Sequence, residues 1–172
     1  MNFFVYGPFE VPRQNRYLVT RSSEDKNDFW DSVEEDADGL PEAIGCYVFY
    51  IRAIPWYIGL AERQPFRTEC FSPHKITRYD SALSKGAGNP QLILIAKLTP
   101  QARFARPSTN GHRDIRMLES LIVGMAVARN QSIENLKGTK LLRRMNVPGV
   151  LNTTRGQGRA LAVQNLRRVL GV

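Results

Sequence analysis

The spacing of apolar residues along the chain predicts a two-stranded hairpin near residue 50. Residues 45–59 (GCYVFYIRAIPWYIG) are rich in β-branched and aromatic side chains and carry a glycine at each outer end. This composition is typical of two short strands joined by a short loop. Because alternate residues of a strand share a face, Tyr47, Phe49 and Ile51 are expected on one side. The short loop would bring Tyr47 and Tyr57 to the same end of the pair.

Helical signals follow in several other segments. Residues 112–130 form the clearest predicted helix, because apolar side chains recur there every three or four positions and make one stripe. An apolar run over 91–98 (QLILIAKL), closed by Pro100, predicts a central strand. Further helices are expected over 23–38, 74–84 and 159–170.

The order of these elements indicates one α+β domain. From residue 45 the chain reads strand, strand, helix, strand, helix, which predicts a small, mainly antiparallel, three-stranded central sheet flanked by helices. A length of 172 residues fits a single domain. Residues 1–44 are interpreted as an N-terminal extension packed on the core. Residues 45–172 then form the domain itself, which ends in a basic helix.

Charge is distributed unevenly along the chain. The formal net charge is +8 and the pI is near 9.9. Residues 1–60 hold 5 Lys and Arg against 10 Asp and Glu, whereas residues 61–172 hold 19 against 6, a net of +13. This excess predicts a polyanionic partner, with nucleic acid as the first expectation. The basic residues are spread over several elements, which disfavours a membrane surface as the partner.

Composition also disfavours several classes of protein. No window approaches the ~18 consecutive apolar residues of a membrane span. Glu10 follows the apolar start too closely for a signal peptide, so a cytoplasmic location is expected. Cys46 and Cys70 form no CxxC pair, a pattern that indicates neither a structural zinc site nor a disulfide framework.

The predicted hairpin carries a family motif. Gly45-Cys46-Tyr47, followed by Tyr57-Ile58-Gly59, resembles the signature of the GIY-YIG nuclease family, with a cysteine where the family usually has isoleucine. The resemblance covers roughly residues 43–153. It implies a GIY-YIG-like fold, a bound Mg²⁺ or Mn²⁺, and hydrolysis of phosphodiester bonds in DNA.

Two charged residues match the positions that this resemblance requires. Phosphodiester hydrolysis needs an activated water, positive charge against the phosphate and support for the leaving oxygen. Arg67, eight residues after Gly59, has the family's arginine spacing, and its guanidinium can contact two phosphate oxygens. Arg63 competes for this role. Glu119, at the margin of the apolar stripe, resembles the metal-binding glutamate. A carboxylate rarely lies against a core unless it is paired or bound to a metal, and pairing with Arg116 or with an arginine of another element is the alternative.

Water activation has several candidates. Tyr47 and Tyr57 are expected to position or activate water, which requires a phenol pKa well below ~10. His74 and Lys75 begin the next helix and offer a base or a phosphate ligand. Some members of the family place a histidine or lysine four residues after the arginine, where this chain has Phe71.

An asparagine and a set of arginines complete the expected site. Asn152, in the sequence PGVLN, resembles the asparagine that closes the active site of the family. Asn130 and Asn135 are nearer to Glu119 in sequence but fall in the polar stretch after the helix. The residues expected to contact nucleic acid are Arg63, Arg78, Arg155 and Arg159.

The sequence therefore predicts a metal-dependent endonuclease acting on double-stranded DNA. Tyr47, Tyr57 and Glu119 are expected to face one cleft. One alternative is a non-catalytic nucleic-acid-binding module of the same fold, and another is an RNA-cutting or toxin-like nuclease. Because no separate recognition domain is visible, specificity would come from loops, a partner protein or a homodimer.

Overall fold

The computed structural model describes residues 2–135 and 139–171. Its centre is a four-stranded sheet in the order β1-β6-β4-β5, with every neighbouring pair antiparallel. A separate two-stranded sheet of β2 and β3 lies beside it. The predicted α+β class is confirmed. The strands are β1 (Asn2–Glu10), β2 (Arg13–Asn15), β3 (Leu18–Val19), β4 (Gly45–Ile51), β5 (Ile54–Ala61) and β6 (Pro90–Leu98).

The prediction of a three-stranded central sheet is wrong by one strand. β1 pairs with β6 from Asn2 opposite Leu98 to Glu10 opposite Gln91, with an irregularity between Tyr6 and Phe9. Half of the main-chain bonding capacity of β6 would otherwise face solvent, because β4 occupies only its other edge. The N-terminal residues thus extend the central sheet directly.

The β4–β5 hairpin is tighter than its sequence suggests. Only Arg52 and Ala53 connect the two strands, and their φ angles are 50° and 60°. Positive φ at both loop residues defines a turn that matches the twist of the strands. The register places Tyr47 opposite Gly59 and Tyr57 opposite Phe49. Tyr47 and Tyr57 therefore lie on adjacent strands and on the same face of the sheet, as predicted.

Three helices cover that face: α1 (Ser23–Asp36), α2 (Phe66–Glu69) and α3 (Pro73–Lys85). The Ser22 side chain caps α1 by accepting a hydrogen bond from the Asp25 N–H. Buried aromatic residues from the helices meet the sheet here; the Tyr79 ring of α3 stacks on Phe49 at 4.1 Å between centroids. The helix predicted over 74–84 is confirmed.

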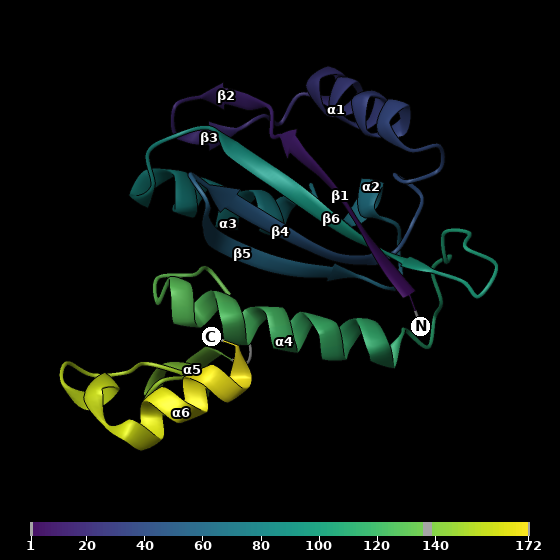
Figure 1. Ribbon diagram of the computed structural model, residues 1–172. Coiled ribbons are helices and arrows are strands. Elements are labelled where there is room, and N and C mark those ends of the chain that lie inside the picture. The colour runs from purple at the N-terminus through teal and green to yellow at the C-terminus, as the bar shows by residue number, and fades with distance from the viewer. Residues whose placement is uncertain (1, 136–138, 172) are drawn as a thin grey trace.

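The opposite face is covered by α4 (Arg113–Arg129), which packs mainly along β5. Ile115 contacts Ile44 and Cys46, and Val123 packs with Ile58 in a second cluster. Figure 1 shows the C-terminal segment beyond α4, away from the sheet. Within the described residues, no helix is both long and apolar enough to cross a membrane. The C-terminal elements are α5 (Thr139–Arg144), the 3₁₀ helix η1 (Gln157–Arg159) and α6 (Leu161–Leu170).

Candidate active site

The two motif tyrosines form a buried pair. Their ring centroids are 6.2 Å apart, and Tyr79 of α3 lies 5.9 Å from Tyr57. Tyr47 is fully buried, and its hydroxyl has no hydrogen bond of ordinary geometry within the described residues. Burial raises the pKa of the Tyr47 phenol well above its usual value. Tyr47 therefore stays protonated at neutral pH and has no contact with water, so it does not have the low pKa expected of a water-activating group.

The second motif glycine makes room for this pair. A Cβ atom built on Gly59 would lie 2.1 Å from Cζ and 2.3 Å from the hydroxyl oxygen of Tyr47. The Tyr47 ring thus lies directly over the Gly59 backbone, in the place that any larger side chain at position 59 would need. Two side chains do not fit at this pair of opposite positions. A tyrosine on one strand therefore requires a glycine opposite it on the other strand.

Tyr57 belongs to a polar cluster at the edge of this aromatic core. Lys75 Nζ donates a hydrogen bond of 2.8 Å to the Tyr57 hydroxyl and lies 3.0 Å from Glu69 Oε1. Gln64 donates to the other carboxylate oxygen of Glu69. Lys75 is 8% exposed, so the ammonium is held between the phenol and the carboxylate with little water around it.

The charge of Lys75 is stabilised by these contacts. Burial opposes the charged form, but the hydrogen bonds to Tyr57 and Glu69 outweigh it and raise the pKa of Lys75. Lys75 is consequently an ammonium at neutral pH and donates to Tyr57. A cation at 2.8 Å stabilises negative charge on the Tyr57 oxygen, whereas Lys75 itself has no free lone pair with which to act as a base.

A hollow of about 320 Å³ opens beside this cluster, where β5 ends. Its lining includes Leu60, Glu62, Gln64 and Glu69. Arg63 lines it as well and is exposed. The hollow therefore brings one guanidinium close to the carboxylate that holds Lys75.

Two other predicted residues lie outside this cluster. Arg67 of α2 is 46% exposed, and its Nε atom lies 3.5 Å from Glu42 Oε1. His74 is exposed on the first turn of α3, and its Nδ1 atom lies 3.3 Å from the Ser72 hydroxyl. Of the arginine pair considered from sequence, Arg63 lines the hollow and Arg67 contacts the loop before β4. Of His74 and Lys75, the structure brings only Lys75 to Tyr57.

Glu119 is on the other side of the sheet. It is half-buried on α4, one turn after Ile115. Burial raises the pKa of the Cys46 thiol to about 12, and the negative charge of Glu119 adds to this effect, which places the carboxylate near Cys46. Cys46 and Tyr47 are consecutive strand residues and point to opposite faces. The prediction that Tyr47, Tyr57 and Glu119 share one cleft is therefore wrong.

A second carboxylate lies between α4 and the hollow. Glu62 accepts hydrogen bonds of 3.0 and 3.1 Å from Arg116 Nη1 and one of 2.7 Å from the His112 N–H. These hydrogen bonds attach Glu62 to the beginning of α4. Glu119 lies on α4 about one turn beyond Arg116.

The donor chemistry on α4 fits a hydrated divalent ion better than an enclosed one. Within residues 2–135 and 139–171 there is no group of three His, Cys, Asp or Glu side chains that could hold a metal. Mg²⁺ commonly keeps several waters and takes one or two protein carboxylates together with substrate phosphate. Glu119 offers one such carboxylate at a half-buried position.

The segment after α4 contains Asn135, an asparagine that the sequence analysis ranked below Asn152. Asn135 is buried; its Oδ1 accepts from the Ile58 N–H at 2.9 Å and its Nδ2 donates to the Ile58 carbonyl at 2.7 Å. Asn130 donates to the Pro55 carbonyl, and the Glu134 N–H donates to the Trp56 carbonyl. This segment therefore holds the outer edge of β5 around Tyr57. The only sequence signal was the shorter distance from Glu119.

The Asn152 side chain forms its hydrogen bonds around the end of α5. Its φ angle is 49°, and its Nδ2 donates to the carbonyls of Leu142 and Met145 at 2.7 and 2.6 Å. Gln131 donates to its Oδ1. Asn152 closes the end of α5 instead of the tyrosine pocket, as an asparagine in a turn commonly does.

The predicted nucleic-acid contacts fall on several elements. Arg78 is half-buried on α3, whereas Arg155 and Arg159 are exposed at and before η1, beyond α4. Arg63 lies at the hollow. Comparison with protein-family models, curated proteins and solved structures finds no match to this chain.

Proposed function

We propose that the protein is a divalent-metal-dependent endonuclease that hydrolyses phosphodiester bonds in DNA, with its reaction centre at the hollow beside the end of β5. The observation that carries the proposal is the buried chain of contacts from Glu69 through Lys75 to the Tyr57 hydroxyl. A charged lysine held against a motif tyrosine, next to an exposed arginine, is an arrangement suited to a phosphate in reaction.

Each residue has a separate role in this proposal. Arg63 binds the non-bridging oxygens of the phosphate at the mouth of the hollow. Lys75 stabilises negative charge on the Tyr57 oxygen, so that Tyr57 as the phenolate takes the proton of the attacking water, becomes the neutral phenol and then releases that proton to solvent. Glu69 keeps the Lys75 ammonium in place. Arg67 lies on the helix beside the hollow and contributes positive potential to incoming DNA.

Glu119 acts from the α4 side of the same strand end. A divalent ion held by its carboxylate would neutralise phosphate charge and support the leaving oxygen. Glu62 orients the beginning of α4 through Arg116 and the His112 N–H, which keeps the Glu119 turn of the helix beside β5. The two faces of the sheet meet at this strand end, since Leu60 and Glu69 both line the hollow.

The test is nicking of a supercoiled plasmid by the full chain with Mg²⁺ or Mn²⁺. Tyr57→Phe removes the hydroxyl and keeps the ring, and should lower the rate by about a hundredfold, within the usual contribution of acid–base catalysis. Tyr50→Phe makes the same change at a half-buried position of the same hairpin and should cut like the wild type. Equal cutting by the Tyr57 variant would remove this residue from the mechanism.

One observation favours a second candidate, a non-catalytic nucleic-acid-binding module. Tyr47, the first motif tyrosine, is fully buried and its raised phenol pKa leaves it protonated, so it serves packing alone. If the wild type binds DNA but cuts no substrate with either metal, the binding module is the better account.

A further inference from the structure

A cavity that the proposed reaction does not use lies at the beginning of α4. It has a volume of about 710 Å³ and is bounded by the end of β6, by the loop after it and by His112. Its polar side chains include Lys97, Arg106 and His112, and its walls include Leu98 and Pro100. No lining residue carries a carboxylate, so the charged groups that face the space are hydrogen-bond donors.

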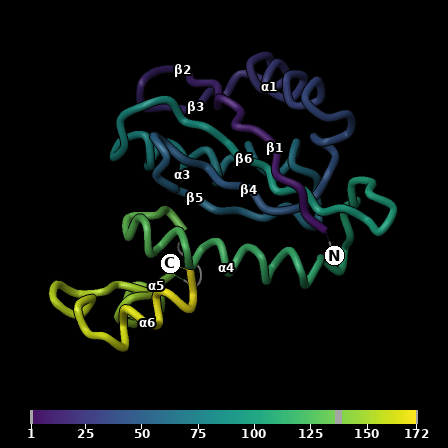
Figure 2. Tube along the Cα trace, viewed as in Figure 1, coloured from purple at the N-terminus to yellow at the C-terminus, as the bar shows by residue number. Residues whose placement is uncertain are grey.

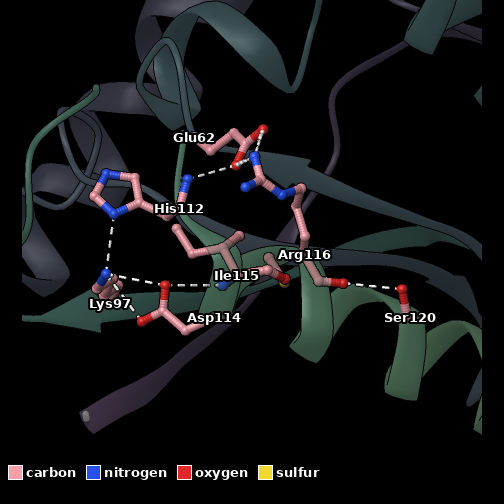
Figure 3. A network of polar contacts seen from close by, with 8 residues as sticks. Glu62, Lys97, His112, Asp114, Ile115, Arg116 and Ser120 are labelled. Carbon is pink, nitrogen blue, oxygen red and sulfur yellow. Dashed lines mark hydrogen bonds and ion pairs between the residues drawn. The ribbon is translucent and has the colours of Figure 1, made fainter. Parts of the chain in front are cut away.

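Lys97 is held in position from behind. Its Nζ lies 3.0 Å from Oδ1 and 2.9 Å from Oδ2 of Asp114, and 2.9 Å from His112 Nδ1 (Figure 3). Burial works against the charge of Asp114, but the Lys97 ammonium outweighs it and lowers the pKa of this carboxyl. The ion pair therefore persists through the neutral range, and its geometry is set before any ligand arrives.

The same contact determines which ring nitrogen of His112 carries the proton. An ammonium can only donate hydrogen bonds, so Nδ1 accepts and the ring proton is on Nε2. Nε2 points away from Lys97 and Asp114 (Figure 3); it is buried and has no acceptor within the described residues. A buried donor without an acceptor is unfavourable, and an oxygen-rich ligand in the cavity would supply the missing acceptor.

Arg106 adds a second positively charged donor to the cavity. It is exposed on the loop between β6 and α4, and it forms no hydrogen bond or ion pair with any of residues 2–135 or 139–171. A guanidinium matches two oxygens of one phosphate. The cavity bordered by Arg106, Lys97 and the ring Nε2–H of His112 is large enough for a phosphate and the sugar attached to it.

We infer that this cavity binds a backbone phosphate of a nucleic-acid strand, at a subsite separate from the reaction centre. The inference rests on the proposed function only in taking nucleic acid as the ligand. His112 precedes Glu119 by seven residues of α4, about 10 Å at 1.5 Å per residue. The apolar walls suit the sugar between phosphates.

The chain offers a direct probe because it has only two histidines, His112 and His74. The ring signals of both are followed by NMR in the full chain at constant pH and ionic strength, without divalent metal. The probes are inorganic phosphate, a short single-stranded deoxyoligonucleotide and its uncharged methylphosphonate counterpart. Phosphate and the oligonucleotide should both shift the His112 signals, and the uncharged strand should not. The signals of His74, which does not line the cavity, are the internal control.

A matched pair of variants locates the effect. Arg106→Gln should weaken both phosphate and oligonucleotide binding at His112 by about tenfold, the loss of one charge-assisted contact. Arg103→Gln makes the same change three residues earlier on the same loop, at a side chain that does not line this cavity, and should bind like the wild type. Arg106→Lys should recover part of the affinity.

Several outcomes would overturn the inference. The site is absent if His112 responds to neither ligand, or if both arginine variants weaken binding equally. If inorganic phosphate shifts His112 and the oligonucleotide does not, the cavity takes small phosphate compounds and the nucleic-acid assignment is wrong. Because no metal and no cleavage enter this measurement, its failure is distinct from failure of plasmid nicking, and either can occur without the other.

Discussion

Single residues explain why the motif hairpin is built as it is. Gly59 leaves space for the Tyr47 ring, and Gly45 lies against the next strand, where an added Cβ would be 2.0 Å from the Ile95 carbonyl oxygen. Neither glycine is replaceable by a small side chain without moving a strand or a ring. The aromatic pair in turn carries the phenol that Lys75 contacts.

Gly59→Ala is expected to destabilise the protein by about 2–3 kcal/mol, in the range for overpacking a well-packed core. The measurement is the urea midpoint, compared with Gly158→Ala, because a Cβ at Gly158 meets nothing within 4 Å. The destabilisation should shrink when Tyr47 is shortened to Val in the same chain, since the clash is with this ring. An unchanged loss in the double variant would show that the ring is not the cause.

Positions that depend only on local spacing were predicted correctly from the sequence. Strand alternation placed Tyr47 and Tyr57 on one face, and helical spacing placed Glu119 at the margin of an apolar stripe. What covers each face of a sheet is a long-range property, so the burial of Tyr47 and the position of Glu119 across the sheet could not be read from those patterns. The approach of Lys75 to Tyr57 depends on the packing of α3 in the same way.

At the scale of elements, β5 is an edge strand with unusual support. It has a partner on one side only, and an exposed edge leaves main-chain groups unpaired. The segment 130–135 hydrogen-bonds four main-chain groups of β5 through Asn130, Glu134 and Asn135. Glu134 also accepts hydrogen bonds from Ser81 and Lys85 of α3, so the segment ties the strand to a helix.

Asn135→Ala should lower stability by about 2–3 kcal/mol, because the Ile58 N–H and C=O both lose buried partners. Hydrogen exchange at the Ile58 amide should accelerate more than at the other amides of β5. Asn165→Ala on α6, where the side chain is exposed, is the matched control. Unchanged protection at Ile58 would mean that the Asn135 contacts do not hold the strand edge.

Elements with a strong local period were predicted well. The helix over 112–130 and the strand over 91–98 are observed as α4 (Arg113–Arg129) and β6 (Pro90–Leu98). The sequence placed the residues of β1 only within an N-terminal extension packed on the core, because nothing within these nine residues specifies that their partner strand lies about ninety residues away. The tight Arg52-Ala53 turn was also missed, since its positive φ angles normally attract asparagine and glycine.

Across the whole molecule, charge is separated in space. The acidic residues of α1 and the basic C-terminal segment lie on opposite sides of the sheet and α4 (Figure 2). Arg155 and Arg159 are exposed in that segment. A polyanion approaching the molecule is therefore attracted to one side and repelled from the other.

DNA affinity should fall steeply with salt, with a log–log slope of roughly −4 to −5 if about five phosphates are neutralised. Replacing Arg155 and Arg159 together by glutamine should reduce the magnitude of this slope by about two. The same double change at Arg13 and Arg16, in the β2–β3 hairpin near α1, should leave it unchanged. Binding is measured by fluorescence anisotropy between low and physiological salt; a flat curve for the wild type contradicts a phosphate-dominated interface.

The central claim is metal-dependent cleavage, and nicking of a supercoiled plasmid by the wild type and Glu119→Gln tests it most directly. The amide keeps the shape of the side chain and removes the charge that a divalent ion needs. At about 1.36 kcal/mol per tenfold in rate, loss of the several kcal/mol that a metal supplies should slow cleavage by about a thousandfold, with DNA affinity retained. Glu35→Gln, an exposed change on α1, should cut normally. Equal cutting by wild type and Glu119→Gln, or no metal-dependent cutting by the wild type, contradicts the account.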